Sequence, residues 1–335
     1  MKTEILSIHT PALFAAAVKR AAKLLRAGEV VALPTETVYG LAANALDEKA
    51  VAGIFQIKGR PANNPIIVHV AGAEMARQCV AAWPHPADSL ARAFWPGPLT
   101  LVLPRAKVIP DIVVAGGATV AVRWPAHPFI QAVIRECGFP LAAPSANASG
   151  QVSPTTAEHV RQELGGKVPL IVDGGPSQVG IESTVLDLTV SPPLILRPGM
   201  IHAESLAAVV ENIQHSTFNI QHSKLRSPGL LKKHYAPKAK LVVFDWLDDV
   251  DLERQLVACH GSRVTCHVIA HTHIPAPGDF AAVTVIPHDA EAFARAIYAE
   301  LHRCDAAGAE WIIVEAPPAA PEWAGIADRL RRAAA

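Results

Sequence analysis

Short apolar segments alternate with helical segments over roughly the first two thirds of this chain, and no other feature narrows the choice of fold as far. Thr10 followed by Pro11 is typical of a helix start, and apolar residues at 14, 18, 21 and 25 continue at helical spacing. Asp47 is placed to cap a second helix. Further apolar runs predict strands at 30–33, 66–70, 100–103, 119–122 and 170–172, and a helix at 128–136. This alternation predicts a layered α/β domain.

The pattern changes after residue 210. Residues 224–240 hold six Lys or Arg and no acidic residue, and an acidic stretch follows directly. A charge reversal punctuated by Pro and Gly is typical of a domain linker. We therefore predict a first domain at 1–210, a basic linker at 211–240 and a smaller α/β domain at 241–335. In the last domain we expect strands at 241–244, 264–269, 283–286 and 311–314, and helices at 291–303 and 324–332.

Composition excludes several classes of protein. Of the 335 residues, 50% are hydrophobic and 18% charged, which is too apolar for a disordered chain. Thirty Lys and Arg balance thirty Asp and Glu, which argues against a dedicated nucleic-acid binder. The longest apolar run, 112–122, is shorter than the roughly 18 residues of a membrane span, and residues 1–10 do not resemble a signal peptide. The 5 scattered cysteines favour reduced thiols, so we expect a soluble cytoplasmic protein without a membrane segment.

The first candidate site is the turn at 34–40, PTETVYG, which follows a predicted strand. Ligands of open α/β sheets bind outside the carboxyl ends of strands. The hydroxyls of Thr35 and Thr37 and the carboxylate of Glu36 are suited to an amine-bearing substrate or a hydrated metal ion. A polar turn that only caps the next segment explains the same residues, so this segment alone leaves both interpretations open.

Cationic residues and a histidine mark other candidates. Lys58 and Arg60 flank a glycine in KGRPANNP, where they would either stabilise a helix C-terminus or bind a polyphosphate. Arg123 shares a strand face with Thr119 and would pair with a carboxylate of a substrate or of the protein itself. His69 lies inside an apolar strand, where a histidine is more often a satisfied core residue than a ligand.

Small and hydroxyl-bearing residues dominate the last two candidate segments. These read AAPSANASGQVSP at 142–154 and DGGPSQVGIESTV at 173–185, and LRPG follows at 196–199. Small side chains allow a ligand to approach the backbone closely, although serine-rich turns have the same composition. The sequence contains no GxxxxGK[ST], GxGxxG or GxSxG pattern. A P-loop, a dinucleotide fingerprint and a serine-hydrolase elbow are therefore not indicated.

Together these segments resemble one family. The chain contains, in this order, PTETVYGLAANA, KGRP..NP...HV, PGPLTLVL, APSAN.SG..SPT, DGG...GIESTVLD and LRPG. From about residue 10 to 199 it closely resembles the L-threonylcarbamoyladenylate synthases built on a YrdC-like domain. SPG at 227–229 and HYAP at 234–237 are similar to the long, two-domain form of that family. The resemblance beyond this point is weaker and depends mainly on GIADRL at 325–330.

The resemblance implies a fold and a set of residue roles. The fold would be α/β, a YrdC-like twisted open mixed sheet with helices, plus a smaller Rossmann-like α/β C-terminal domain. The family's Lys-x-Arg and Ser-x-Asn motif, taken as catalytic, corresponds to Lys58, Arg60, Ser145 and Asn147. L-threonine would be held by Thr37, His69, Arg123, Ala143 and Ser183. ATP would be held by Arg60, Asn64, Thr119, Ser145, Ser153, Arg197 and, closing over the nucleotide from the linker, Tyr235.

It also implies an activity. Members join L-threonine, bicarbonate and ATP into threonylcarbamoyl-AMP and pyrophosphate, and the product passes to the downstream machinery that transfers threonylcarbamoyl to tRNA. Mg²⁺ would accompany ATP, although the sequence offers no obvious all-protein metal cage. The candidate residues include no nucleophile–base pair, which favours catalysis by positioning and charge stabilisation.

Two alternatives come with the same resemblance. YrdC-like domains also occur in hydrogenase-maturation carbamoyltransferases, which are larger chains with acylphosphatase-like and zinc-finger regions that this sequence lacks. A translation-associated module that makes weak contact with RNA is the second alternative, and the neutral net charge counts against it.

Two features outside the motifs are also open to interpretation. The basic segment 224–240 would act either as a mobile lid over the site or as a solvated tether. The C-terminal domain gathers possible zinc ligands, but their spacing matches no common zinc motif, and neighbouring strand residues 266 and 267 point to opposite faces. These residues are Cys259, His260, Cys266, His267, His271 and His273. We expect no metal site there.

Overall fold

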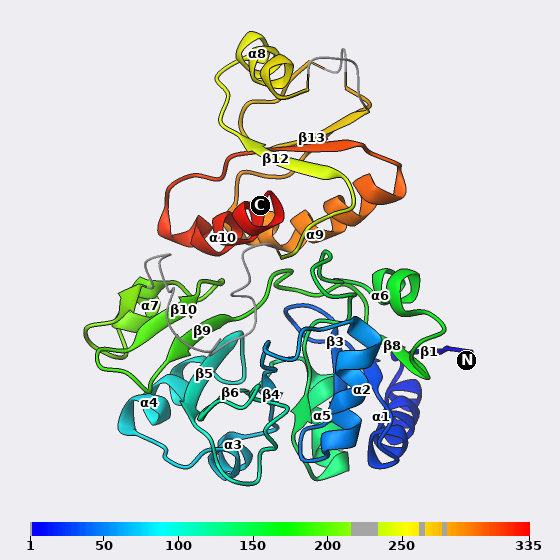
Figure 1. Ribbon diagram of the computed structural model, residues 1–335, viewed down its shortest axis with the longest axis vertical. Helices are drawn as coiled ribbons and strands as arrows, with labels where there is room; N and C mark the ends of the chain where they lie inside the picture. The colour runs from blue at the N-terminus through cyan, green and yellow to red at the C-terminus, as the bar shows by residue number, and fades with distance from the viewer. Residues whose placement is uncertain (1, 216–233, 261–264, 277–279) are drawn as a thin grey trace. The chain divides into compact units, whose positions relative to one another are not determined.

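The computed structural model describes residues 2–215, 234–260, 265–276 and 280–335 (Figure 1). The chain divides into two compact units, which we call unit 1 (1–149 with 153–230) and unit 2 (150–152 with 231–335). Much of the predicted linker, including the SPG segment at 227–229, lies outside the described residues. The lid or tether interpretation of 224–240 therefore stays a prediction for 224–233, while 234–240 are described as part of unit 2.

A mixed sheet forms the centre of unit 1. Within the described residues it has 11 strands in the order β1-β8-β2-β3-β7-β4-β6-β5-β9-β10-β11. Parallel pairs such as β4–β6 and antiparallel pairs such as β2–β3 occur in the same sheet, which confirms the predicted open mixed sheet. The strands are β1 (Glu4–Ser7), β2 (Val31–Leu33), β3 (Gly40–Asn44), β4 (Val68–His69), β5 (Leu99–Pro104), β6 (Thr119–Arg123), β7 (Leu141–Ala142), β8 (Leu170–Asp173), β9 (Thr184–Asp187), β10 (Leu194–Arg197) and β11 (Gln214–His215).

Helices cover both faces of this sheet. They are α1 (Pro11–Arg26), α2 (Glu48–Lys58), α3 (Ala73–Cys79), α4 (His85–Phe94), α5 (Pro128–Cys137), α6 (Ala157–Leu164) and α7 (Ala203–Ala207). The predicted caps are confirmed, because Thr10 Oγ1 accepts from the backbone N–H of Leu13 and Asp47 caps α2. Helices α1 and α5 pack on each other (Figure 1) and share a core with Val31 and Leu33 of β2. Ala32, which points to the opposite face, packs in the core that includes α2.

Several strands differ from the sequence-based expectation. The run 66–70 forms ladder pairs only over Val68–His69, because Ile66 N–H donates to a loop carbonyl, that of Val113. Strands β1, β9, β10 and β11 were not among the predicted strands, and neither was β3, which pairs with both β2 and β7. Its sequence, GLAAN, consists mostly of residues with low strand propensity, and burial in the middle of the sheet overrides that preference.

Unit 2 is a smaller α/β layer structure. Its 4 described strands are all parallel, in the order β12-β15-β13-β14, which confirms the predicted Rossmann-like architecture. Helix α8, which was not predicted, falls in the acidic stretch after β12. The elements are β12 (Lys240–Phe244), α8 (Asp249–His260), β13 (Cys266–Ala270), β14 (Ala282–Val285), α9 (Ala290–Ala306), β15 (Trp311–Glu315), the 3₁₀ turn η1 (Pro321–Trp323) and α10 (Ala324–Ala333).

Two further properties bear on the sequence predictions. No helix in the described parts of the chain combines the length and apolar character that crossing a membrane requires. Four cysteines are buried thiols outside any disulfide, namely Cys79, Cys137, Cys266 and Cys304.

The packing of α1 yields a stability prediction. Leu25 on this helix is 1% exposed in the core, whereas Leu13 on the same helix is 48% exposed. We expect Leu25→Ala to lower the free energy of unfolding of unit 1 by about 2–5 kcal/mol, because it removes buried apolar contacts and leaves a cavity. The matched control Leu13→Ala should change it by less than about 0.5 kcal/mol. Urea unfolding followed by circular dichroism measures both, and equal effects would contradict this packing.

Candidate active site

The turn at 34–39, between β2 and β3, is the centre of a cluster of loops. Thr35, Glu36 and Thr37 are all buried. The carbonyl oxygens of Glu36 and Thr37 accept hydrogen bonds from the backbone of the 173–185 segment, at Val179 (2.7 Å) and Gly180 (3.1 Å). Tyr39 bonds through its backbone to the 142–154 segment. The three polar segments that the sequence singled out separately are therefore bonded to one another.

Arg123, at the end of β6, carries the charge nearest this turn. Its Nη1 donates to Thr37 Oγ1 at 2.9 Å, its Nε donates to the carbonyl of Gly97 at 3.2 Å, and its Nη2 lies 2.7 Å from Glu36 Oε1. Glu36 Oε1 also accepts from the backbone N–H of Ala126 at 2.8 Å. The sequence left open whether Arg123 pairs with a carboxylate of a substrate or of the protein. The structure shows an ion pair with a carboxylate of the protein, that of Glu36. The other carboxylate oxygen, Oε2, is buried without a partner among the described residues.

The surroundings fix the protonation states here. Burial raises the pKa of Glu36, but the charge of Arg123 and the hydrogen bonds from Arg123 and Ala126 outweigh it, so the pKa lies below its ordinary value of 4.5. His69 is paired with Arg123 in the β4–β6 ladder, and burial together with the charge of Arg123 lowers its pKa to about 3. His69 is therefore neutral near pH 7, and its Nδ1 is buried without a partner in the described structure.

Lys58 connects helix α2 to the serine-rich segment. Its Nζ donates to the carbonyl oxygens of Ser145 and Asn147, each at 2.5 Å, and to Asn147 Oδ1 at 3.1 Å. Ser145 Oγ donates to the same Oδ1 at 2.5 Å. Burial, followed by the charge of Arg60, holds the pKa of Lys58 well below its ordinary value. Lys58 thus points away from the end of its own helix and binds the Ser-x-Asn turn directly.

Arg60 and Asn64 belong to the loop that follows α2. Gly59 ends the helix in the left-handed conformation, with φ of 62°, and this turns the chain into the loop. Arg60 donates to the carbonyl oxygens of Asn64 (3.0 Å) and Pro65 (2.6 Å). Asn64 is fully buried, and both polar atoms of its amide lack a partner among the described residues. Buried polar groups are almost always bonded, so this unbonded amide is an exception that calls for an explanation.

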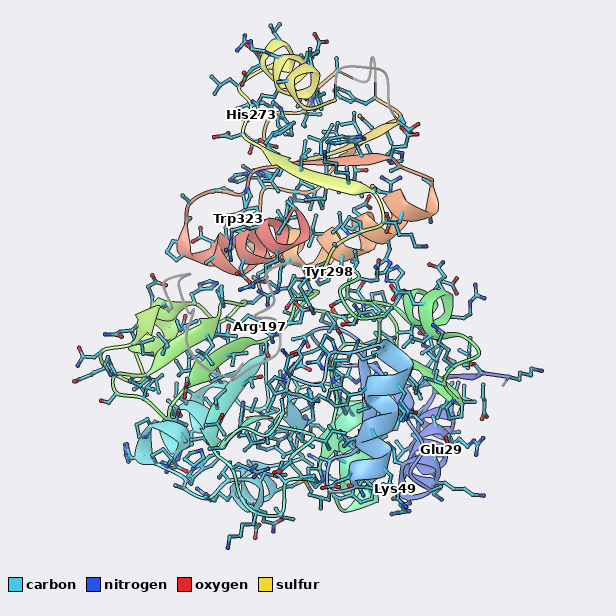
Figure 2. All side chains as sticks on the ribbon, in the orientation of Figure 1. Glu29, Lys49, Arg197, His273, Tyr298 and Trp323 are labelled. Atoms are coloured by element: carbon cyan, nitrogen blue, oxygen red, sulfur yellow. The ribbon has the colours of Figure 1, made fainter. Side chains whose placement is uncertain are left out.

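A third group lies where β9 and β10 meet. Arg197 donates through Nε to the carbonyl of Ser183 (3.0 Å) and through Nη2 to its Oγ (3.1 Å). Figure 2 labels Arg197, near the end of β10. The hydroxyl of Thr100 on β5 lies 2.8 Å from Ser183 Oγ. Nearby in the sequence, Ser153 Oγ donates to Glu182 Oε1 at 2.5 Å.

The remaining predicted residues are placed as follows. Ala143 is buried just after β7, and its backbone N–H bonds to the carbonyl of Ile67. Thr119 begins β6, so by the rise of a strand it lies roughly 13 Å from Arg123 at the other end. Tyr235 belongs to unit 2, unlike the other predicted site residues. Among the predicted residues of unit 1, the structure bonds Thr37 to Arg123, Lys58 and Ser145 to Asn147, Arg60 to Asn64, and Ser183 to Arg197.

Comparisons with known proteins identify the family. A model of the Sua5/YciO/YrdC family, described as telomere recombination, matches residues 23–199, and one described as threonylcarbamoyl-AMP synthase, C-terminal domain, matches 201–335. The threonylcarbamoyl-AMP synthase of Schizosaccharomyces pombe is 35% identical over 367 residues, covering 95% of this chain and 88% of the relative. The chain belongs to the threonylcarbamoyl-AMP synthase family. It is therefore an enzyme, as the sequence predicted.

Other members of the threonylcarbamoyl-AMP synthase family agree. The Pyrococcus abyssi enzyme is 47% identical over 230 residues, which is 68% of both chains. A solved structure described as P. abyssi Sua5 complexed with L-threonine has a TM-score of 0.91 at 37% identity, covering 100% of this chain and 98% of that one. Escherichia coli YciO, at 23% identity and a TM-score of 0.53, covers 59% of this chain and shares the fold.

Three side chains are bonded to predicted site residues without being assigned a role by the resemblance, and of these only Glu36 was singled out as a candidate from the sequence. Glu36 holds Arg123, Thr100 bonds to Ser183, and Glu182 accepts from Ser153. Thr100 could have been identified from the sequence, because it is the single polar residue within the apolar strand 99–103. Glu36 and Glu182 lie inside the motifs, but their partners come from distant segments.

No group of three or more His, Cys, Asp or Glu side chains suited to a metal ion occurs within the described ranges. Of the possible zinc ligands in unit 2, the side chains at 259 and 260 lie outside the description. His271 and His273 bond instead to neighbouring protein groups, including Glu315.

The buried Glu36–Arg123 pair predicts a pH-dependent stability. We expect Glu36→Gln to lower the free energy of unfolding by about 3 kcal/mol at pH 7, because Arg123 loses its buried counter-charge. Since the folded pKa of Glu36 is depressed, its contribution is complete above about pH 4.5 and is lost as the pH falls through the folded value. Urea unfolding from pH 7 to pH 3.5 should therefore show the two proteins converging in acid.

The control is Glu158→Gln, which removes an exposed ion pair with Arg161 and should cost at most about 1 kcal/mol. Curves for wild type and Glu36→Gln that stay parallel down to pH 3.5 would contradict the ion-pair interpretation.

Proposed function

We propose that unit 1 joins L-threonine, bicarbonate and ATP into threonylcarbamoyl-AMP and pyrophosphate. One observation carries this proposal. Buried cationic side chains lie in segments that also bury polar atoms without a protein partner, at His69 and Asn64. Such atoms lower stability unless a ligand bonds them, and the surrounding positive charge selects anionic ligands. Family membership supplies the identity of the substrates.

L-threonine would bind in the group around Arg123. The guanidinium of Arg123 suits the substrate carboxylate, because it is already oriented by Glu36, Thr37 and the Gly97 carbonyl. Neutral His69 can accept a hydrogen bond from the amine or the hydroxyl of the substrate. The other proposed contacts are Thr37, Ala143 and Ser183. The bound L-threonine named for the P. abyssi structure supports this assignment.

ATP would bind along the groups of Lys58 and Arg197. Arg60 and Arg197 would neutralise the phosphates, and the unpartnered amide of Asn64 would bond to the nucleotide. Thr119, Ser145 and Ser153 complete the proposed ATP contacts in unit 1. The role of Tyr235 in ATP binding stays a prediction from the family resemblance, as does closure of a lid. Lys58 and Asn147 keep the Ser-x-Asn turn in place beside these contacts.

The reaction needs positioning more than protein chemistry. The amine of L-threonine attacks bicarbonate to give a carbamate with loss of water, and a carbamate oxygen then attacks the α-phosphorus as pyrophosphate leaves. Holding the reactants in line accounts for much of the rate, and buried cations stabilise the developing charge. The residues proposed here as site residues include no Ser–His or Cys–His pair, which fits a mechanism without a covalent enzyme intermediate.

Mg²⁺ would enter with ATP as part of the substrate. The described residues gather no protein cage for it, and Mg²⁺ commonly retains water and binds through substrate phosphates. The product would pass to the tRNA threonylcarbamoyl-transfer machinery in the cytoplasm. Of the alternatives, neither a carbamoyl-transfer protein nor an RNA-binding module is favoured, because the relatives matched over most of the chain are named threonylcarbamoyl-AMP synthases.

The direct test is pyrophosphate release from ATP and Mg²⁺, with L-threonine and bicarbonate each omitted in turn. We expect release only when both are present, and threonylcarbamoyl-AMP as the co-product by mass spectrometry. Pyrophosphate release without L-threonine would overturn the proposal, and carbamoyl phosphate would then be the next substrate to test. RNA binding that survives high salt without nucleotide would favour the RNA alternative.

The proposed role of Arg123 predicts a selective kinetic defect. Arg123→Lys keeps the charge but loses the planar fork, so we expect the KM for L-threonine to rise at least about tenfold while the KM for ATP changes little. Arg105→Lys, at a half-buried arginine that pairs with Asp111 beyond the end of β5, is the control and should leave both KM values unchanged. A rise confined to the KM for ATP would contradict the assignment.

A further inference from the structure

Unit 2 is a parallel α/β layer, and a set of its backbone N–H groups that could bind an anion is occupied by a carboxylate of the protein. At the carboxyl ends of β13 and β15, the backbone N–H groups of His271, Thr272 and His273 all donate to the carboxylate of Glu315, at 2.6–3.0 Å. Three convergent N–H groups are what a phosphate would otherwise use. Helix α8, which follows β12, begins with Asp249 and Asp251 in its first turn. The contribution of unit 2 is therefore to be sought elsewhere in its structure.

The HYAP segment at 234–237 is bonded into unit 2 by its backbone. His234 N–H donates to the carbonyl of Arg332 at 3.2 Å, and Ala236 N–H donates to the carbonyl of Gly150 at 2.9 Å. Between them Tyr235 has a φ of 63°, a left-handed conformation that a bulky residue adopts only when its surroundings enforce it. The backbone of this segment is thus fixed at both sides of Tyr235.

The ring of Tyr235 lies against two side chains of unit 2. Tyr298 of α9, labelled in Figure 2, stacks with it at 6.1 Å between centroids and an interplanar angle of 27°. The guanidinium carbon of Arg329 on α10 lies 5.3 Å from the centre of the Tyr235 ring. This distance is within the range of a cation–π contact, so the ring is held by a charge as well as by stacking.

Arg329 is itself fixed by the GIADRLRR segment. Its Nη1 bonds to Asp328 Oδ2 at 3.1 Å and to the carbonyl of Gly325 at 3.4 Å. Asp328 is buried and also bonds to Arg331 and Arg332. Burial alone would raise the pKa of Asp328, but the charges of Arg329, Arg332 and Arg331 outweigh burial and hold the pKa below its ordinary value. The carboxylate therefore stays ionised near pH 7. A charged network therefore orients the guanidinium that faces Tyr235.

We propose that Arg329, oriented by Asp328, is a positioning residue for Tyr235. The inference rests on the proposed role of Tyr235 in the synthase reaction. It gives the 325–332 segment, which the catalytic assignment left unused, a function in presenting the HYAP turn. Arg329 acts through Tyr235 and is not expected to touch the substrate.

The test is a double-mutant cycle in the full chain, with Arg329→Met and Tyr235→Ala. We expect Arg329→Met to raise both the KM and the calorimetric Kd for ATP about tenfold, with the KM for L-threonine unchanged, because the cation–π contact is lost. In the Tyr235→Ala background the same change should have no further effect. Arg331→Met is the matched control, since Arg331 also pairs with Asp328 through a side chain that is 47% exposed, and it should leave ATP binding unchanged.

Further observations separate a loss of positioning from a loss of folding in Arg329→Met. Asp328 keeps Arg331 and Arg332 as partners in Arg329→Met, so no buried carboxylate loses all its counter-charges. Hydrogen exchange should become faster at the amides of His234 and Ala236 and stay unchanged in β12 to β15. Arg329→Lys, which can keep a cation over the ring, should recover part of the ATP affinity.

The outcomes separate the two proposals. An Arg329→Met defect that is equally large in the Tyr235→Ala background would overturn the positioning role while leaving the synthase function intact. Unchanged ATP binding and turnover in Tyr235→Ala alone would overturn both the role of Tyr235 and this inference. If the wild-type protein shows no threonine-dependent release of pyrophosphate, the proposed function itself is refuted.

Discussion

The burial of cationic side chains is the constraint on which the architecture of unit 1 depends. Lys58, Arg60, Arg123 and Arg197 are each less than 9% exposed, and a charge removed from water must find hydrogen-bond acceptors. Backbone carbonyl oxygens of neighbouring loops supply them, at Ser145, Asn64, Gly97 and Ser183. Carbonyl groups accept hydrogen bonds from these donors without carrying an opposing charge, and at Arg123 a buried carboxylate, that of Glu36, is also an ion-pair partner.

The mixed sheet makes this arrangement possible. Antiparallel pairing of β2 with β3 sends the chain through the 34–39 turn, and the backbone of that turn bonds to the 142–154 and 173–185 segments. Residues far apart in the sequence are therefore held to one another by main-chain bonds that do not depend on side-chain identity. The protonation states of His69 and Glu36 then depend on burial and on the charge of Arg123. Function in this family depends on the site more than on the sheet itself.

Unit 2 also shows that the fold and the functional residues are separate matters. Its sheet is parallel and is layered with helices, yet Glu315 occupies the N–H groups at the carboxyl ends of its strands. Its helices α9 and α10 instead hold Tyr235 between Tyr298 and Arg329. The proposed role of this domain thus lies in residues of its helices and not at the ends of its strands, and that role is to orient the side chain of Tyr235.

The sequence by itself determined the α/β class, the caps of α1 and α2, the strands β5, β6, β8 and β15, and the family, because hydrophobic periodicity, capping residues and motifs are local properties. It could not predict β3, since buried Gly and Ala residues carry little strand signal, or α8 in its acidic stretch. Only the tertiary structure decided which motif residues bond to each other. The pairing of Lys58 with Asn147, of Arg123 with Glu36 and of Arg329 with Tyr235 depends on contacts across the chain, and so do the lowered pKa values of Lys58 and His69, because burial is a property of the folded chain alone.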